Sequence, residues 1–271
     1  MTRSRFLNDL LRYGILSIAA FLSVFPFIWM LIGTTNTSAD IVKGKASFGQ
    51  NLWPNITALF EQVDILRVLF NSFFISIVGT VLTLIIASAA GYGFEMFRSK
   101  TREKVFTGLL LMLSIPFAAL MVPLFVMFAK VGLLNSYTAI IAPGIANIFV
   151  IFYFRQATKS FPHELRDAAK IDGLKEWQIF ARVYMPVMRS TYAAATIIVF
   201  MLNWNNYLWP LIVLQTNEMK TMVLTISSLA SAYTPDYGVI MVATVITTLP
   251  TLIIFFVLQR LFVQGMLGSV K

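Results

Sequence analysis

The most informative residue spacing lies in one segment, Glu164–Pro186, which we call the polar loop. Glu164 suits the positive end of a helix dipole, and Asp172 followed by Gly173 is a typical helix stop because glycine readily adopts the left-handed conformation. The helix between these signals carries two small side chains that would let a partner approach closely. This pattern predicts that the helix contacts a partner through one face, made of Leu165, Ala168, Ala169 and Asp172.

A second short helix is expected after Gly173, and Pro186 should bend the chain into the apolar stretch that follows. The polar loop would then be two short helices at an angle. Two interpretations fit this amphipathic pattern: a knob that docks on another protein, or a basic pair lying on the bilayer surface. The stripe expected on the second helix is Trp177, Phe180, Ala181 and Tyr184.

A second group of residues combines aromatic rings with amides. Flat rings can stack on sugar faces, and amides can bind hydroxyl groups, so the group could line a solute pathway. The alternative is an interfacial aromatic belt with hydrogen bonds between helices. The substrate-pathway candidates are Trp204, Asn205, Asn206, Tyr207 and Trp209.

The sequence lacks the residues that thiol chemistry, a histidine-rich metal site or nucleotide hydrolysis would require. Cysteine is absent, His163 is the single histidine, and no GxxxxGK[ST] nucleotide-binding motif occurs. Paired carboxylates are also missing from the long apolar stretches. We therefore expect no catalytic residue, no metal site and no cofactor bound by this chain.

The composition points to a membrane. Of 271 residues, 58% are hydrophobic and 12% are charged, about half the charge of an ordinary soluble domain. Such a chain is too apolar for a water-soluble globule and too rich in aromatics for disorder. The net charge of +9 would suit nucleic-acid binding only if its cations clustered on a water-facing surface. We expect membrane lipid around this protein and no nucleic-acid partner.

Six stretches free of charged residues are long enough to cross a bilayer. The first is too long for a signal-peptide core and reads as a retained anchor. The expected spans are Tyr13–Gly33, Asn71–Phe94, Val105–Ala129, Tyr137–Phe154, Ser190–Leu214 and Tyr237–Gln259.

Charge predicts the orientation. With six spans, 16 of the 21 Lys and Arg residues fall on the side of the termini and of the polar loop, and 5 on the other. By the positive-inside rule both termini and the polar loop are cytoplasmic, so the net excess of positive charge is an orientation signal.

The polar loop resembles the EAA signature of type I ATP-binding-cassette importer permeases. An acidic residue, two alanines, a glycine four residues later and a proline thirteen beyond it characterise that signature. The matching residues, with two neighbouring acids, are Glu164, Asp167, Ala168, Ala169, Asp172, Gly173 and Pro186. The departures are mild: Asp167 stands where Glu is usual, and Leu174 where Ala is common.

Two further patterns extend the resemblance to carbohydrate permeases, and in particular to the second permease subunit of maltose-type importers. Asn203–Leu211 looks like their WN…PL pattern, and residues 262–271 look like their short tail. The resemblance implies an all-α membrane protein with six transmembrane helices and a cytoplasmic coupling-helix loop. It also implies a heterodimer with a second permease, two cytoplasmic ATPase subunits that use ATP and Mg, and an extracytoplasmic solute-binding protein.

The expected organisation has three parts. Residues 1–70 would form an anchor helix with an outer loop, 71–262 the ABC transmembrane domain, and 263–271 a cytoplasmic tail. The resulting hypothesis is a non-enzymatic permease subunit of a sugar or oligosaccharide importer in a bacterial inner membrane. The alternatives are the same fold serving glycerol phosphate, a polyamine or an amino acid, and a membrane scaffold without an ATPase. An anionic solute would favour cations within the spans, where this chain has none.

Overall fold

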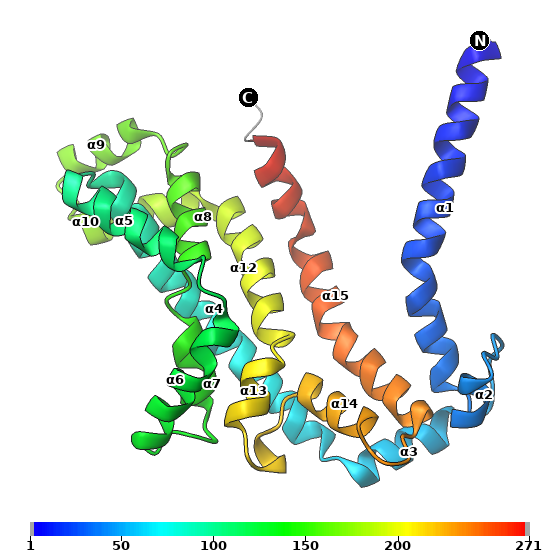
Figure 1. The fold of residues 1–271 in the computed structure, drawn as a ribbon. Coiled ribbons are helices and arrows are strands. Elements are labelled where there is room, and N and C mark those ends of the chain that lie inside the picture. The colour runs from blue at the N-terminus through cyan, green and yellow to red at the C-terminus, as the bar shows by residue number, and fades with distance from the viewer. Residues whose placement is uncertain (1–2, 269–271) are drawn as a thin grey trace. The chain divides into compact units, whose positions relative to one another are not determined.

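The computed structural model describes residues 3–268, with side chains from residue 9 to residue 260. Throughout that range the secondary structure is helical, without a β-strand, as Figure 1 shows. This confirms the all-α prediction. The chain divides into two compact units, Met1–Ile65 with Thr225–Leu249, and Leu66–Leu224 with Pro250–Lys271.

The first unit begins with a long apolar helix, α1 (Arg3–Thr34), whose side chains from Asp9 onward are mostly exposed. Exposed leucine, isoleucine and phenylalanine along its length suit contact with lipid. The other helices with residues in this unit are α2 (Ser38–Val42), α3 (Leu52–Gln62), α14 (Met222–Ala230) and the first half of α15 (Tyr237–Gly268).

Two buried amides organise the connection that follows α1. Asn36 donates from Nδ2 to the Ser47 carbonyl at 2.9 Å, and Asn55 donates to the Thr34 carbonyl at 2.9 Å. A Cβ added to Gly238 would lie 2.6 Å from the Asn55 amide, so α15 begins in close contact with α3. The polar, turn-rich outer loop expected from the sequence is thus a folded element with its own hydrogen-bonded interior.

The second unit contains the remaining helices. In chain order these are α4 (Ile65–Met96), α5 (Lys100–Met112), α6 (Phe117–Lys130), α7 (Tyr137–Ile141), η1 (Ala142–Gly144), α8 (Ile148–Thr158), α9 (His163–Ile171), α10 (Glu176–Ile179), η2 (Phe180–Tyr184), α11 (Met185–Val187), α12 (Arg189–Trp204), α13 (Leu208–Val213) and η3 (Asn217–Met219).

Four helical segments of the described chain are long and apolar enough to cross a membrane, and two bent helix pairs bring the number to as many as six. The expected third span is not one straight helix, because α5 and α6 meet at 98°. Pro116 is the N-cap of α6, and a proline disfavours the helical conformation in the residue before it. The expected fourth span is likewise a pair, η1 following α7 and then α8, bent by 42°.

The last helix reaches beyond the expected sixth span. Residues 263–268 of the expected tail continue α15 as helix. Residues 269–271 lie outside the described range, as do the side chains of the tail motif and of the basic N-terminal residues Arg3 and Arg5.

α4 and α8 approach each other closely in the second unit. A Cβ added to Gly91 would lie 2.7 Å from both the Phe154 Cβ atom and the Arg155 backbone nitrogen. Ala87 and Val150 are fully buried beside this contact. Small residues allow such helix contacts in membranes, where packing rather than water exclusion drives association. This contact sets the ends of α4 and α8, on which the polar loop rests.

Candidate functional site: the polar loop and the fifth-span cluster

The first helix of the polar loop begins and ends as predicted. α9 follows Pro162, its N-cap, and has Glu164 in its first turn. Asp172 is its C-cap, and Gly173 adopts a φ of +80°, the left-handed conformation that glycine tolerates. The Leu174 backbone N–H donates to the Ala169 carbonyl at 3.0 Å, which satisfies one of the last free carbonyls of the helix.

The two alanines of α9 do not share one open face. Ala168 is exposed, but Ala169 is 6% exposed and packs inside the chain. The expectation that both form a flat face for a partner is therefore wrong for Ala169. The residues of the predicted set that face outward are Glu164, Asp167, Ala168, Asp172, Gly173 and Pro186.

The second half of the polar loop is wound differently from the prediction. α10 runs into η2, a π-helix in which the Met185 backbone N–H bonds to the Phe180 carbonyl five residues back. Ile179 and Tyr184, also five residues apart, are both fully buried. Of the predicted stripe, Tyr184 is buried and Phe180 is half-buried, whereas Ala181 is exposed. Because a π-turn inserts an extra residue, it brings Ile179 into the buried row with Tyr184. Trp177 is instead 64% exposed.

An ion-pair network braces the two halves of the loop. Glu176 accepts from Arg166 at 2.6 Å and from the Tyr92 hydroxyl, at the end of α4, at 3.0 Å. Lys170 lies 3.2 Å from the same carboxylate. Burial alone would raise the pKa of Glu176, but the hydrogen bonds from Arg166, Tyr92 and Lys170 outweigh it and hold the pKa below its ordinary value. The sequence reasoning missed this network, although Arg166 and Glu176 flank the predicted turn.

Aromatic packing fixes the loop on the ends of the long helices. The Tyr184 ring lies 4.8 Å from the Tyr92 ring and 5.3 Å from the Phe161 ring, centroid to centroid. The Tyr184 hydroxyl is 2.7 Å from Thr158 Oγ1, at the end of α8. η2 is therefore joined to α4 and α8 through buried contacts of Tyr184.

In the fifth-span cluster, which comprises the predicted pathway residues Trp204, Asn205, Asn206, Tyr207 and Trp209, the two tryptophans are interior. Trp209 is 1% exposed, and its Nε1 donates to the Ala139 carbonyl at 2.7 Å. Trp204 is 2% exposed and packs at 5.0 Å from the Phe73 ring and 5.6 Å from the Phe200 ring. These contacts give both tryptophans a packing role in the second unit.

The remaining cluster residues sit at the break between α12 and α13. Asn205 is exposed and donates from Nδ2 to the Met201 carbonyl at 2.9 Å. Asn206 and Tyr207 are half-buried. These three residues are the accessible part of the predicted pathway set, and a pathway role for the set stays a prediction.

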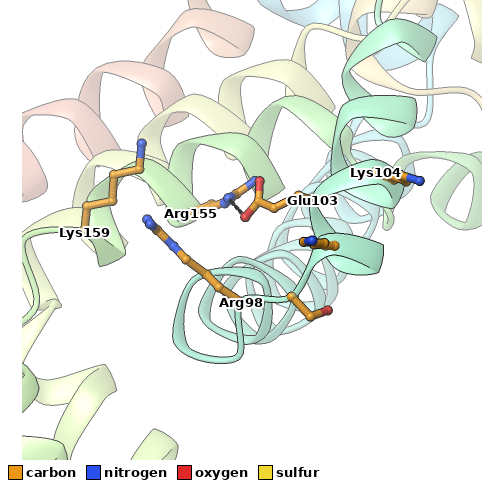
Figure 2. Close-up of a pocket in the computed structure, with 7 residues that line it drawn as sticks. Arg98, Glu103, Lys104, Arg155 and Lys159 are labelled. Atoms are coloured by element: carbon orange, nitrogen blue, oxygen red, sulfur yellow. Dashed lines mark hydrogen bonds and ion pairs between the residues drawn. The ribbon is translucent and has the colours of Figure 1, made fainter.

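A charged corner that the sequence reasoning missed lies beside the polar loop. Arg155, 6% exposed at the end of α8, lies 2.5 Å from a Glu103 oxygen and 3.4 Å from a Glu95 oxygen. Arg98 also pairs with Glu95. Figure 2 shows the side chains around the Arg155–Glu103 pair. A buried guanidinium requires such partners, because an unpaired one would lose its hydration without compensation.

The arrangement is thus a braced, exposed helix pair at the ends of apolar helices. A family model described as "Binding-protein-dependent transport system inner membrane component" matches residues 79–268, which include the polar loop and the fifth-span cluster. The chain belongs to this family. It is therefore an inner-membrane component of a binding-protein-dependent transport system, a permease subunit.

Relatives that match over their full length and one solved structure agree with this family assignment. The lactose transport system permease protein LacG of Rhizobium radiobacter is 64% identical over 270 residues, covering 100% of this chain and 99% of that protein. The arabinooligosaccharides transport system permease protein AraQ of Halalkalibacterium halodurans is 35% identical, covering 99% and 98%. A chain of a bacterial ABC transporter that imports alginate matches with a TM-score of 0.84 at 20% identity, covering 97% and 99%, and supports the type I permease fold.

Proposed function

We propose that this chain is one of two permease subunits of an ATP-driven importer that carries a sugar or oligosaccharide into the cell. The observation that carries the proposal is the polar loop, whose outward face is exposed while its inner face is braced by Glu176 and Tyr184. The sugar is inferred from relatives that match over their whole length and are named for lactose and arabinooligosaccharides. A disaccharide or short oligosaccharide is the solute class that these names favour.

In this proposal the face of Glu164, Ala168 and Gly173, together with the exposed ring of Trp177, docks in a groove on a cytoplasmic ATPase. A second ATPase receives the equivalent loop of a second, different permease, and both use ATP and Mg. When the ATPases close, the loop moves and displaces the ends of α4 and α8, which are joined to it through Tyr92 and Tyr184. The permease thereby couples a movement of its partners to a change of access across the membrane.

The solute passes between the two permeases and arrives on an extracytoplasmic binding protein. One solved relative is a bacterial alginate ABC transporter in complex with a periplasmic protein that holds an alginate pentasaccharide, which supports a partner of this kind. Asn205, Asn206 and Tyr207 are our candidates for sugar contacts, because amides and a phenol offer hydrogen bonds to hydroxyl groups. Both termini and the polar loop lie in the cytoplasm, as the charge distribution predicts.

A second candidate is transport of an anionic solute. The sn-glycerol-3-phosphate transport system permease protein UgpE of Yersinia pestis is 28% identical, covering 97% of each chain. The lower identity favours it less than the sugar relatives. A phosphate ester would also favour Arg or Lys along the pathway, where the expected spans have neither.

The decisive experiment replaces Gly173 in the assembled importer. Gly173 and Gly132 both have positive φ, of +80° and +68°, and neither has atoms within 4 Å of an added Cβ. Gly173→Val and Gly132→Val therefore impose a similar backbone strain of about 1–2 kcal/mol at two different places. We expect Gly173→Val to abolish lactose uptake in membrane vesicles and Gly132→Val to reduce it only modestly, with solute affinity of the binding protein unchanged in both.

Gly173→Asn separates docking from strain. Asparagine tolerates the left-handed conformation, so this variant keeps the fold and places a side chain on the outward face. Loss of uptake with normal expression supports docking at that face. Normal uptake and normal stimulation of ATP hydrolysis in both Gly173 variants would refute the proposed role of the polar loop.

A further inference from the structure

A basic pocket lies at the corner where α4 ends and α5 begins, against the end of α8. It measures about 660 Å³ and is lined by the side chains of Arg98, Ser99, Lys100, Glu103, Lys104, Arg155 and Lys159. Five of these seven residues are cationic and one is acidic. The volume lies in the range of small-ligand sites, and the excess of positive charge indicates an anionic ligand.

The cations of the pocket are of two kinds. Arg155 and Arg98 are engaged by Glu95 and Glu103 and fix the shape of the corner. Lys100, Lys104 and Lys159 are exposed and form no ion pair with any residue whose side chain the structure describes. Figure 2 shows Lys159 and Lys104 on opposite sides of the Arg155–Glu103 pair. Three amines therefore remain available to an external anion beside a preformed ionic framework.

The start of α5 adds to the positive potential. Ser99 is its N-cap and accepts from the Arg102 backbone N–H, whereas the first turn of this 13-residue helix begins at Lys100. The N-terminus of a helix carries a partial positive charge and free backbone N–H groups, which favour phosphate. Ser99 and Lys100, at this helix start, line the same pocket as Lys104 and Lys159.

The surroundings of the pocket favour a lipid over a soluble anion as its ligand. Along α5, directly after the basic turn, Val105, Leu111 and Met112 are 52%, 68% and 55% exposed. An apolar exposed face next to a basic turn matches the profile of a bilayer, with acyl chains beside the former and headgroups beside the latter. A soluble anion would use the amines but not this face. Basic pockets between transmembrane helices on the cytoplasmic side are typical headgroup sites.

We propose that this basic pocket binds the phosphate headgroup of an anionic phospholipid, with Lys100, Lys104 and Lys159 as the cationic contacts and the acyl chains along the exposed face of α5. The site adjoins the polar loop in sequence, because Lys159 precedes α9 by four residues. A bound lipid would reinforce the corner formed by α4, α5 and α8. The inference does not depend on the transported solute.

The test titrates fluorescent phosphatidylglycerol onto the purified full-length chain in neutral detergent. The variant is Lys100→Gln with Lys104→Gln, and the matched control is Lys43→Gln with Lys130→Gln, two exposed lysines outside the pocket. Each cation near a headgroup contributes about a fivefold change in affinity, so the pocket variant should bind about 25-fold more weakly. The control, with the same net charge, should stay within about twofold of the original chain.

Two further arms identify the ligand and guard against misfolding. Lys100→Arg with Lys104→Arg keeps both charges and should retain binding, and thermal melting should show all variants folded. Unlabelled phosphatidylglycerol should displace the probe, whereas phosphatidylcholine and inorganic phosphate should not. Equal binding by the pocket variant and its control would overturn the proposal. So would displacement by inorganic phosphate alone, or loss of ATPase association in the glutamine variant without loss of lipid binding.

Discussion

The two candidate regions of the second unit, the polar loop and the fifth-span cluster, differ in the burial of their tryptophans. Trp177 in the polar loop is 64% exposed, whereas Trp209 in the fifth-span cluster is 1% exposed and hydrogen-bonded to a backbone carbonyl. The same residue type thus has opposite surroundings in two segments that both looked functional. The exposed ring on the polar loop is accessible to a partner, whereas the buried ring with its N–H satisfied belongs to the core.

The polar loop and the aromatic cluster also differ in how they are held. Polar contacts to Glu176 and aromatic contacts to Tyr184 attach the loop, and its outer face is exposed. The cluster is held by ring packing on Trp204 and Trp209 from several helices. Function proposed for the loop therefore rests on exposed residues, and function proposed for the cluster rests on the break at Asn205–Tyr207.

The largest expected effect distinguishes core from surface. Trp209→Ala should destabilise the permease by about 3–5 kcal/mol, because it leaves a cavity beside Phe128 and an unpaired Ala139 carbonyl. The measurement is thermal melting and expression of the full chain in detergent. A variant with unchanged melting would mean that the ring is not packed, and Trp209 would return to the pathway candidates.

The matching change in the polar loop should behave in the opposite way. Trp177→Ala should alter stability by less than about 0.5 kcal/mol, since the ring is mostly exposed. It should weaken association with the ATPase by about 30-fold, the effect of losing a hot spot of about 2 kcal/mol. Copurification of the ATPase with the permease measures this. Destabilisation without loss of association would contradict the docking surface.

The smallest expected effect concerns the brace. Glu176→Gln should lower stability by about 1 kcal/mol or less, because the carboxylate side chain is 35% exposed and partly screened. The pKa of Glu176 is lowered in the folded chain, so this contribution is fully present above the ordinary value of 4.5 and is lost as the pH falls through the lowered pKa.

Melting curves across that acid range should therefore converge for the original chain and Glu176→Gln, and separate above it. Glu164→Gln is the control, because Glu164 is exposed in the same loop and its outward position gives it no place in the brace. A pH dependence in Glu176→Gln equal to that of the original chain would place the titrating group elsewhere.

Local rules explain which features could be predicted. The start of α9 after Pro162, its stop at Asp172 and the left-handed Gly173 follow from residues within a few positions of each other. The order of the apolar segments also follows from composition, although the 98° bend between α5 and α6 was missed. The proline signal at Pro116 was present in the sequence, and the length of the apolar stretch concealed it.

Features that depend on distant residues could not be predicted. The burial of Ile179 together with Tyr184 follows from the π-turn in η2, and the Tyr184 ring packs against Phe161, which precedes the polar loop. Tyr92, 84 residues from Glu176 in the chain, supplies one of its hydrogen bonds. The hydrophobic pattern cannot predict which residue of a long apolar helix contacts the polar loop, because almost every face of such a helix is apolar.

Composition and charge predicted a helical membrane protein and the side expected to face the cytoplasm, and the resemblance of the polar loop to the EAA signature predicted a permease and the segment expected to meet the ATPase. These depend on residue type and local spacing, which the chain carries in any conformation. Which tryptophan is buried, which charges meet at Arg155 and where a basic pocket opens depend on packing between helices far apart in sequence. That packing is decided by how well similar apolar surfaces fit one another in shape. Such a fit between surfaces arises only when the chain is folded.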